Sequence, residues 1–302
     1  MSVEKLRALK QFGIEVPEAE YAPPGHTACA GCPGAAMMRQ MLKLLGPKVV
    51  LTNPASCSGY FARAVEVPLC RCLFEVAAAS GTGIRAALDV RGDKETVVLV
   101  WAGDGGTADI GIQALSAAAE RNEDFIYACY DNEGYMMTGM QRSSSTPAGA
   151  WTTTTPLPQP KKERKKDMVA IMAAHHIPYV ATATIAYPED LIRKVLKAKT
   201  IRGTRFFNLL APCPTGWRFA PNLSVKLARL AVESMVFPLL EVEEDGVRWT
   251  VQQPHQEIPV RDYIKMQGRF GHLDEADIEA MEKSVRGEWE LLLAKASRVC
   301  EL

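Results

Sequence analysis

The sequence predicts an α/β fold in which a parallel β-sheet is flanked by helices and continues into a C-terminal arm. Apolar, β-branched runs at residues 97–101 (VVLVW) and 125–130 (FIYACY) are typical of strands buried on both faces of a parallel sheet. Between them lies a helical pattern, with apolar positions at Ile110, Ile112, Leu115 and Ala118. Strand, helix and strand in this order form a βαβ unit, whose two strands run parallel.

The composition is that of an ordinary globular protein. Lys and Arg number 35, as do Asp and Glu, so charge gives no reason to expect binding to nucleic acid or to a membrane surface. No apolar run approaches the roughly 18 residues of a membrane-spanning helix. The N-terminal segment is charged and helical in pattern, without the apolar core of a signal peptide. We therefore expect a cytoplasmic protein of one large domain or two.

The elements before residue 97 follow the same alternation. A helix is predicted after Pro33, a short strand at residues 49–52 and a small-residue helix within residues 75–88. The strand at residues 49–52 ends in the loop Asn53-Pro54-Ala55-Ser56-Cys57-Ser58-Gly59.

A glycine-rich turn with one carboxylate follows the strand at residues 97–101. It reads Gly103-Asp104-Gly105-Gly106, and the next strand ends in Asp131-Asn132-Glu133-Gly134. Glycines let a backbone approach a phosphate, and an Asp with an Asn can hold a hard cation that bridges phosphate oxygens. Ligands bind at the carboxyl ends of parallel strands in open α/β sheets, so Asp104 and Asn132 are candidates for such a site. The alternative is an ordinary βαβ unit whose turn residues bind nothing.

The alternation continues after residue 166. We predict a helix at residues 168–176, a strand at 179–183, a helix that begins near Pro188 and a last core strand at 205–210. The rest gives a helix, a hairpin that turns near Asp245, and two C-terminal helical patterns. We therefore divide the chain into a first domain, residues 1–220, and an arm, residues 221–302, that packs on this domain or on a partner subunit.

Four of the eight cysteines lie in loops, and in a cytosolic chain they favour metal or cluster binding over disulfides. They are Cys29 and Cys32 in a C-x-x-C motif, Cys57 after the strand at residues 49–52, and Cys213, before a proline, after the strand at 205–210. Four thiolates suit a [4Fe–4S] cluster or zinc, and one close pair with two distant cysteines fits a cluster better. A redox-active thiol pair, or two buried thiols without a ligand, are the alternatives for the C-x-x-C motif. The remaining cysteines are interpreted as packing residues or poor ligands: Cys70, Cys72, Cys129 and Cys300.

These motifs together resemble the β subunits of the pyruvate:ferredoxin oxidoreductase family, the 2-oxoacid:acceptor oxidoreductases that use thiamine diphosphate. The resemblance covers most of the chain and is carried by GHTACAGCPG, TNPASCSGY, GDGGTADIG, DNEGYMMTGMQRSSSTP, LLAPCPTGW, FPLLEVEEDG and IPVRDYIKMQGRFGHL. It implies a thiamine-diphosphate-binding fold, with residues 1–220 as the diphosphate-binding module. It also implies oxidative decarboxylation of a 2-oxo acid to acyl-CoA and CO₂, with electrons passed singly to a [4Fe–4S] cluster.

The resemblance assigns roles to residues and to partners. Mg²⁺ on the diphosphate would be held by Asp104, Asn132 and the carbonyl of Gly134, and the cofactor would also contact Gly103, Gly105, Gly106 and Ser58. The cluster, which not every family member carries, would be held by Cys29, Cys32, Cys57 and Cys213. The pyrimidine-side half of the site would lie on an α subunit of a hetero-oligomer that includes γ- and δ-type subunits. Coenzyme A would take the acyl group, and ferredoxin or another acceptor would take the electrons.

One residue departs from the family pattern. Many family members have an asparagine where this chain has Met137, near the reactive face of the cofactor. A thioether removes a hydrogen-bonding group and makes a pocket more apolar. We therefore take Met137 as a candidate pocket-lining residue and expect a branched or aromatic 2-oxo acid rather than pyruvate.

Residues 151–166 (WTTTTPLPQPKKERKK) have no apolar periodicity and predict an exposed loop that ends in a basic run, Lys161 to Lys166. It is either a solvated connector or a docking surface for an acidic partner such as ferredoxin.

Two other functions remain open. One is a non-oxidative thiamine-diphosphate decarboxylase subunit with zinc on the four cysteines, and the other is a non-catalytic electron-transfer module that has kept the fold.

Overall fold

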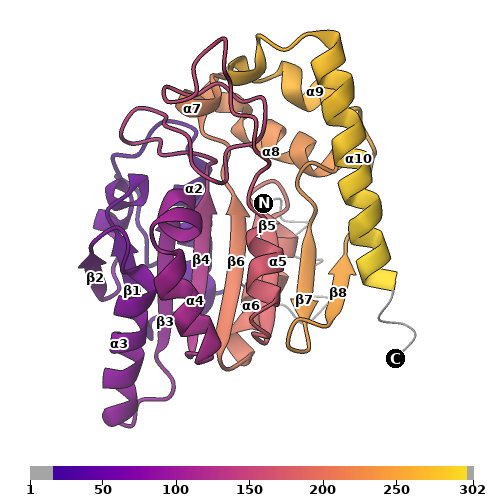
Figure 1. The fold of residues 1–302 in the computed structure, drawn as a ribbon. Helices are drawn as coiled ribbons and strands as arrows, with labels where there is room; N and C mark the ends of the chain where they lie inside the picture. The colour runs from indigo at the N-terminus through magenta and orange to yellow at the C-terminus, as the bar shows by residue number, and fades with distance from the viewer. Residues whose placement is uncertain (1–15, 298–302) are drawn as a thin grey trace.

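The computed structural model describes residues 16–297. Most of the predicted N-terminal helix, within residues 1–15, and Cys300 lie outside the described residues. Within them, an eight-stranded sheet has the order β2-β1-β3-β4-β6-β5-β7-β8 (Figure 1). The strands are β1 (Val49–Pro54), β2 (Leu69–Cys72), β3 (Val97–Gly103), β4 (Phe125–Asp131), β5 (Tyr179–Thr184), β6 (Thr204–Leu210), β7 (Leu240–Glu243) and β8 (Arg248–Val251).

The sheet is mostly parallel, as predicted. Strands β1 to β6 pair in parallel, whereas β7 is antiparallel to both β5 and β8. The hairpin predicted near Asp245 is the β7–β8 pair, and it extends the main sheet at the β5 edge. Because six neighbouring strands point the same way, their carboxyl ends form one edge of the sheet, at the top in Figure 1.

Helices cover both faces of this sheet (Figure 1). They are α2 (Pro33–Leu45), α3 (Ala77–Val90), α4 (Ile112–Glu120), α5 (Met168–Ala173), α6 (Pro188–Thr200), α7 (Pro214–Trp217), α8 (Ser224–Glu233), α9 (Val260–Lys265) and α10 (Glu275–Ser297). Shorter helical turns are η1 (Cys57–Tyr60), η2 (Ala62–Ala64), η3 (Gly105–Asp109), η4 (Pro221–Leu223) and η5 (Gly268–Phe270).

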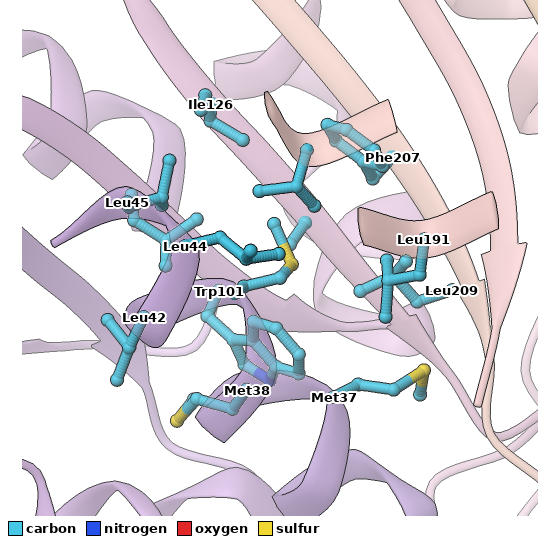
Figure 2. Close-up of a cluster of buried hydrophobic side chains, with 14 of the residues drawn as sticks. Met37, Met38, Leu42, Leu44, Leu45, Trp101, Ile126, Leu191, Phe207 and Leu209 are labelled. Carbon is cyan, nitrogen blue, oxygen red and sulfur yellow. The ribbon is translucent and has the colours of Figure 1, made fainter. Parts of the chain in front are cut away.

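The alternating directions of the side chains along β3 explain why an apolar cluster lies on each face of the sheet. Leu99 and Trp101 belong to the apolar cluster beneath α2 and α6, whereas Val98 and Val100 belong to the cluster beneath α3, α4 and α5. Successive strand residues point to opposite faces, so a run without polar residues requires helices on both sides. Figure 2 shows the first cluster, which includes Trp101 and Met37.

The helix after β3 begins later than its sequence pattern predicts. Residues 105–109 form a π-helical turn, and α4 follows from Ile112. Leu115 and Ala118 are buried as expected, but Ile110 lies on the intervening turn and is 53% exposed. The shift occurs because the glycine-rich turn, not the apolar periodicity, sets the entry of the chain into this helix.

Residues 221–297 pack on the rest of the described chain. Their apolar side chains form a third cluster with Trp217 and Leu210, and α10 lies along β8. The division into two domains at residue 220, and the packing of the arm on a partner subunit, stay predictions. Among residues 16–297, no helix is both long and apolar enough to cross a membrane.

Candidate functional site

The glycine-rich turn after β3 is held closely by aromatic neighbours. A Cβ added at Gly105 would lie 2.3 Å from Cε1 of Tyr135, and one added at Gly106 would lie 3.1 Å from the ring of Phe74. The Tyr135 ring is fixed in turn, because its hydroxyl donates to Oδ2 of Asp109 at 2.7 Å. Gly105 is therefore required by the packing of this chain, whereas a Cβ at Gly103 meets nothing within 4 Å.

Three oxygen atoms converge beside this turn. The side-chain amide of Asn132 directs its oxygen at the Gly134 carbonyl, 2.8 Å away, and at Oδ1 of Asp104, 2.9 Å away. Turned over, the amide would donate hydrogen bonds to both. Asp104 is buried, and its other oxygen accepts a hydrogen bond of 2.6 Å from the Ser143 hydroxyl. The Asn132 amide can therefore meet these two oxygens either with its nitrogen, as a hydrogen-bond donor, or with its oxygen, around a shared cation.

The spacing of these oxygens fits Mg²⁺. Mg²⁺ prefers octahedral ligands at about 2.0–2.1 Å, for which neighbouring ligands are about 2.9 Å apart. Burial and the nearby Asp131 carboxylate raise the pKa of Asp104 well above its usual range, although the Ser143 hydroxyl opposes this. A divalent cation would favour the ionised carboxylate. The structure thus brings together Asp104, Asn132 and Gly134, the three residues predicted from the sequence.

A buried network of charges lies behind this group. Lys165 donates to Oδ2 of Asp131 at 2.7 Å and to Oε1 of Glu133 at 2.8 Å. Arg269, from η5, donates to Oε2 of Glu133 at 2.6 Å. Burial opposes the ionisation of Glu133, but the charges of Lys165 and Arg269 outweigh it and lower the pKa of this carboxyl. The acidic loop after β4 is therefore neutralised from two distant segments.

The basic run is therefore not the exposed patch that its sequence predicts. Lys161 is buried, and its ammonium donates to the carbonyls of Glu163 and Arg164 at 2.8 and 3.2 Å and to that of Thr146. Lys165 turns inward, and Lys166 reaches the carbonyl of Ala108. Residues 162–164 remain exposed. Neither a solvated connector nor a docking surface describes the whole run, because half of it serves the interior.

The four loop cysteines converge at the same edge of the sheet. Cys32 caps α2, Cys57 begins η1 after β1, and Cys213 caps α7 after β6. Burial, together with the thiols of Cys213, Cys32 and Cys29, raises the pKa of Cys57 to about 12. Burial is also the main cause that raises the pKa of Cys213 to about 11, and Cys32 and Cys29 add to it. Cys29 and Cys32 thus lie near enough to Cys57 and Cys213 to affect the ionisation of these two thiols.

Among residues 16–297, no three His, Cys, Asp or Glu side chains are grouped closely enough to hold one metal ion. The Gly216 N–H points at Cys213 Sγ at 3.3 Å, which is the kind of hydrogen bond that cluster sulfurs accept.

Tyr130 connects the cysteines to the loop that follows β4. It lies next to Asp131 on β4, is 2% exposed, and its hydroxyl is 3.3 Å from Sγ of Cys32. Gly34 makes room for it, since a Cβ there would lie 2.4 Å from the Tyr130 ring.

The other predicted residues have less defined positions. Ser58 is buried and accepts a hydrogen bond of 2.6 Å from Asn53 near the end of β1. Met137 is 48% exposed at the tip of the loop after Gly134, whereas its neighbour Met136 packs against Gly134 and Gly216. Two of the remaining cysteines pack as predicted: Cys72 lies against the second core cluster, and Cys129 is buried within β4.

Four residues that contribute contacts to the site were not predicted from the sequence: Ser143, Lys165, Trp217 and Arg269. Ser143 stands in a hydroxyl-rich run, Ser143-Ser144-Ser145-Thr146, which was a usable signal. Lys165, Trp217 and Arg269 have no such sequence signal, because their role depends on contacts with residues far away in the chain.

The chain is similar to known proteins over most of its length. A family model described as "Thiamine pyrophosphate enzyme, C-terminal TPP binding domain" matches residues 70–209. The chain is 47% identical to ketoisovalerate oxidoreductase subunit VorB of Pyrococcus furiosus, over 92% of this chain and 94% of that one. It is also 47% identical to pyruvate synthase subunit PorB of Methanocaldococcus jannaschii, over 92% and 98% of the two chains.

A solved structure shows the same fold. It is a 2-oxoglutarate:ferredoxin oxidoreductase from Magnetococcus marinus with 2-oxoglutarate, coenzyme A and succinyl-CoA bound. The TM-score is 0.59 at 22% identity, over 72% of this chain and 82% of that chain.

Proposed function

The chain belongs to the β subunits of the 2-oxoacid:ferredoxin oxidoreductases, within the thiamine pyrophosphate enzymes, and from this we propose that it carries the diphosphate half of the cofactor site together with a [4Fe–4S] cluster. The observation that carries the first part is the convergence of three oxygens, on Asp104, Asn132 and Gly134, at the spacing of Mg²⁺ ligands.

Each group in this site has a separate task. Thiamine diphosphate, when bound, supplies the electron sink for the loss of CO₂ from a 2-oxo acid. Asp104 and Asn132 hold the cation that binds the diphosphate, and the Ser143 hydroxyl orients the Asp104 carboxylate. Gly103, Gly105 and Gly106 keep the backbone open for the diphosphate. Cys29, Cys32, Cys57 and Cys213 hold the cluster at the neighbouring strand ends, where single electrons can leave.

Other components of the reaction are supplied by partner subunits and substrates. An α subunit completes the pyrimidine side of the site, and γ- and δ-type subunits carry electrons onward to ferredoxin or another acceptor. Coenzyme A takes the acyl group. The isolated chain is therefore inactive, and steady turnover of a 2-oxo acid by this chain alone would contradict the assignment.

Purification of the native complex without oxygen tests the cofactors. We expect a brown protein that bleaches on reduction and contains iron, sulfide, magnesium and thiamine diphosphate. A colourless protein with zinc and thiamine diphosphate would support the non-oxidative decarboxylase. Iron and sulfide without thiamine diphosphate would support the electron-transfer module.

We further propose a branched or aromatic 2-oxo acid as the substrate. The support is Met137, whose half-exposed thioether stands at the tip of the loop that follows the cation ligands. Sequence identity does not indicate which 2-oxo acid is the substrate, because relatives named for ketoisovalerate and for pyruvate are both 47% identical to this chain.

Turnover of pyruvate, 2-oxoisovalerate and phenylglyoxylate by the whole complex tests this. We expect the bulkier acids to have the higher kcat/KM, and Met137→Asn to shift the preference towards pyruvate, whereas Met137→Leu retains it. A clear preference of the unaltered complex for pyruvate would exclude the proposal.

A further inference from the structure

We propose that Lys165 and Arg269 are positioning residues that hold Glu133 and thereby set the Mg²⁺ ligands on either side of it. This inference rests on the proposed function, because it concerns the geometry of the same cation site. It assigns a role to part of the basic run that its sequence does not suggest.

Glu133 occupies the position on which the cation loop depends. It lies between Asn132, whose amide oxygen is one proposed ligand, and Gly134, whose carbonyl is another. Its φ is +64°, a left-handed conformation that residues with a Cβ rarely adopt. Such a conformation persists only where surrounding contacts fix it. The side chain of Glu133 therefore has to be held if its two neighbours are to face Asp104.

The contacts that hold Glu133 come from both sides of its carboxylate. Lys165 bonds Oε1 at 2.8 Å and Arg269 bonds Oε2 at 2.6 Å. Its carbonyl accepts a hydrogen bond of 2.8 Å from the Thr146 hydroxyl, and its N–H donates to Asp131 at 3.1 Å. Every polar group of this residue thus has a partner outside the cation site.

Arg269 also holds the loop through a second path. Its guanidinium lies over the Trp217 ring, 3.8 Å from the ring centre, and the Trp217 N–H donates to the carbonyl of Asn132 at 2.8 Å. The Arg269 Nε bonds the Gln267 side chain at 2.9 Å. One buried guanidinium therefore fixes Glu133 directly and Asn132 through an aromatic ring, so two successive residues of the loop are held by one side chain.

A role through charge alone predicts the opposite effect on cation binding. Asp104, Asp131 and Glu133 are three carboxylates, and Lys165 and Arg269 are two cations close to them. Removing either cation makes the surroundings more negative, and so by charge alone would tighten the binding of a divalent ion. If these residues act by position, their removal weakens binding despite the gain in negative charge. The sign of the change therefore separates the two explanations.

The test measures Mn²⁺, as a stand-in for Mg²⁺, by EPR titration of the complex after removal of thiamine diphosphate. Lys165→Met and Arg269→Met should weaken binding by about 10–100-fold, the range found when partners behind metal ligands are removed. Lys165→Arg should bind within about threefold of the unaltered complex, since it keeps a donor to both carboxylates. Lys162→Met, in the exposed part of the same run, is the matched control and should leave binding unchanged.

Trp217→Phe removes the N–H that bonds the Asn132 carbonyl and leaves the charge unchanged. It should therefore weaken Mn²⁺ binding if the loop is held by position, even where the methionine variants do not assemble, whereas charge alone predicts no change. Unchanged or tighter binding in Lys165→Met, Arg269→Met or Trp217→Phe would show a purely structural or electrostatic role and overturn the proposal. Asp104→Asn distinguishes failure of this positioning role from failure of the proposed function. If it too binds Mn²⁺ as the unaltered complex does, the cation site itself has been misassigned.

Discussion

Replacing Tyr130 by Phe removes one hydroxyl from between the cation loop and the cysteines. The Tyr130 ring is fixed, because it stacks on Trp101 at 6.3 Å, meets Phe61 edge-on at 6.0 Å and fills the space that Gly34 leaves. Phe can therefore take its place without a shift of the backbone. Burial, followed by the nearby Cys32, raises the pKa of Tyr130 well above its usual range. The phenol therefore stays protonated, and it can donate to Sγ of Cys32, 3.3 Å away, when that sulfur binds the proposed cluster.

The size of the expected change in midpoint potential follows from the contact between the Tyr130 hydroxyl and Cys32. A hydrogen bond to a charged group contributes about 1.5–3 kcal/mol, and only the part gained when the cluster takes up an electron affects its potential. If that part is about 1 kcal/mol, the midpoint potential of a one-electron couple falls by about 40 mV, given 59 mV for each tenfold change. The midpoint potential falls because the reduced cluster carries more negative charge than the oxidised cluster. It therefore loses more stabilisation when the hydrogen-bond donor is removed.

The assay is a redox titration of the whole complex followed by EPR, with iron and sulfide content measured in parallel. Tyr127→Phe is the matched control, because it removes a buried hydroxyl from the same strand on the opposite face, where the partner is Thr107 at 3.1 Å. We expect Tyr130→Phe to keep its cluster and lower the potential, and Tyr127→Phe to leave it unchanged. An unchanged or higher potential in Tyr130→Phe, with full cluster content, would refute the reasoning.

Three further predictions concern the cluster, the turn and stability. Cys213→Ser should lose iron, sulfide and visible absorbance, whereas Cys72→Ser should retain them; equal retention would count against the ligand set. Gly105→Ala should lower the unfolding midpoint, since overpacking costs about 1–3 kcal/mol, whereas Gly103→Ala should leave the midpoint unchanged and weaken thiamine diphosphate binding measured by calorimetry. Burial opposes the ionisation of Glu241, but hydrogen bonds and charges from a tyrosine, an arginine and a lysine lower its pKa from 4.5 to about 2. Its stabilisation is then complete above about pH 4.5 and lost as the pH falls towards 2. Glu241→Gln should therefore reduce the free energy of unfolding by about 3 kcal/mol at neutral pH and flatten its dependence on pH between about pH 4.5 and pH 2 in urea titrations.

The sheet was predictable because its signal is local. Buried parallel strands such as β3 and β4 are continuous apolar runs, and the residues that follow each strand must meet at one edge. That rule was sufficient to place Asp104 beside Asn132, and Cys57 at the same edge as Cys213. It needed no knowledge of distant contacts, since topology alone brings strand ends together.

The surroundings of the site were not predictable in the same way. A run of lysines without apolar periodicity indicates exposure, yet Lys161 and Lys165 point inward, because buried carbonyls and carboxylates from other segments pair with them. Arg269 meets Glu133 across more than a hundred residues. No local pattern encodes such pairs, and a basic side chain has the same appearance in a sequence whether it meets water or a buried acid.

These long-range cations also resolve a conflict in the local motif. Three carboxylates, Asp104, Asp131 and Glu133, gather where an anionic diphosphate is expected to bind, and with one divalent cation they would leave a net negative charge that repels it. Lys165 and Arg269 reverse the sign, because the five side chains together with the proposed Mg²⁺ would carry one positive charge. The acidic loop can therefore serve a phosphate-binding site only in a fold that returns these two cations to it. This explains why residues without a sequence signal stand behind the ligands that have one.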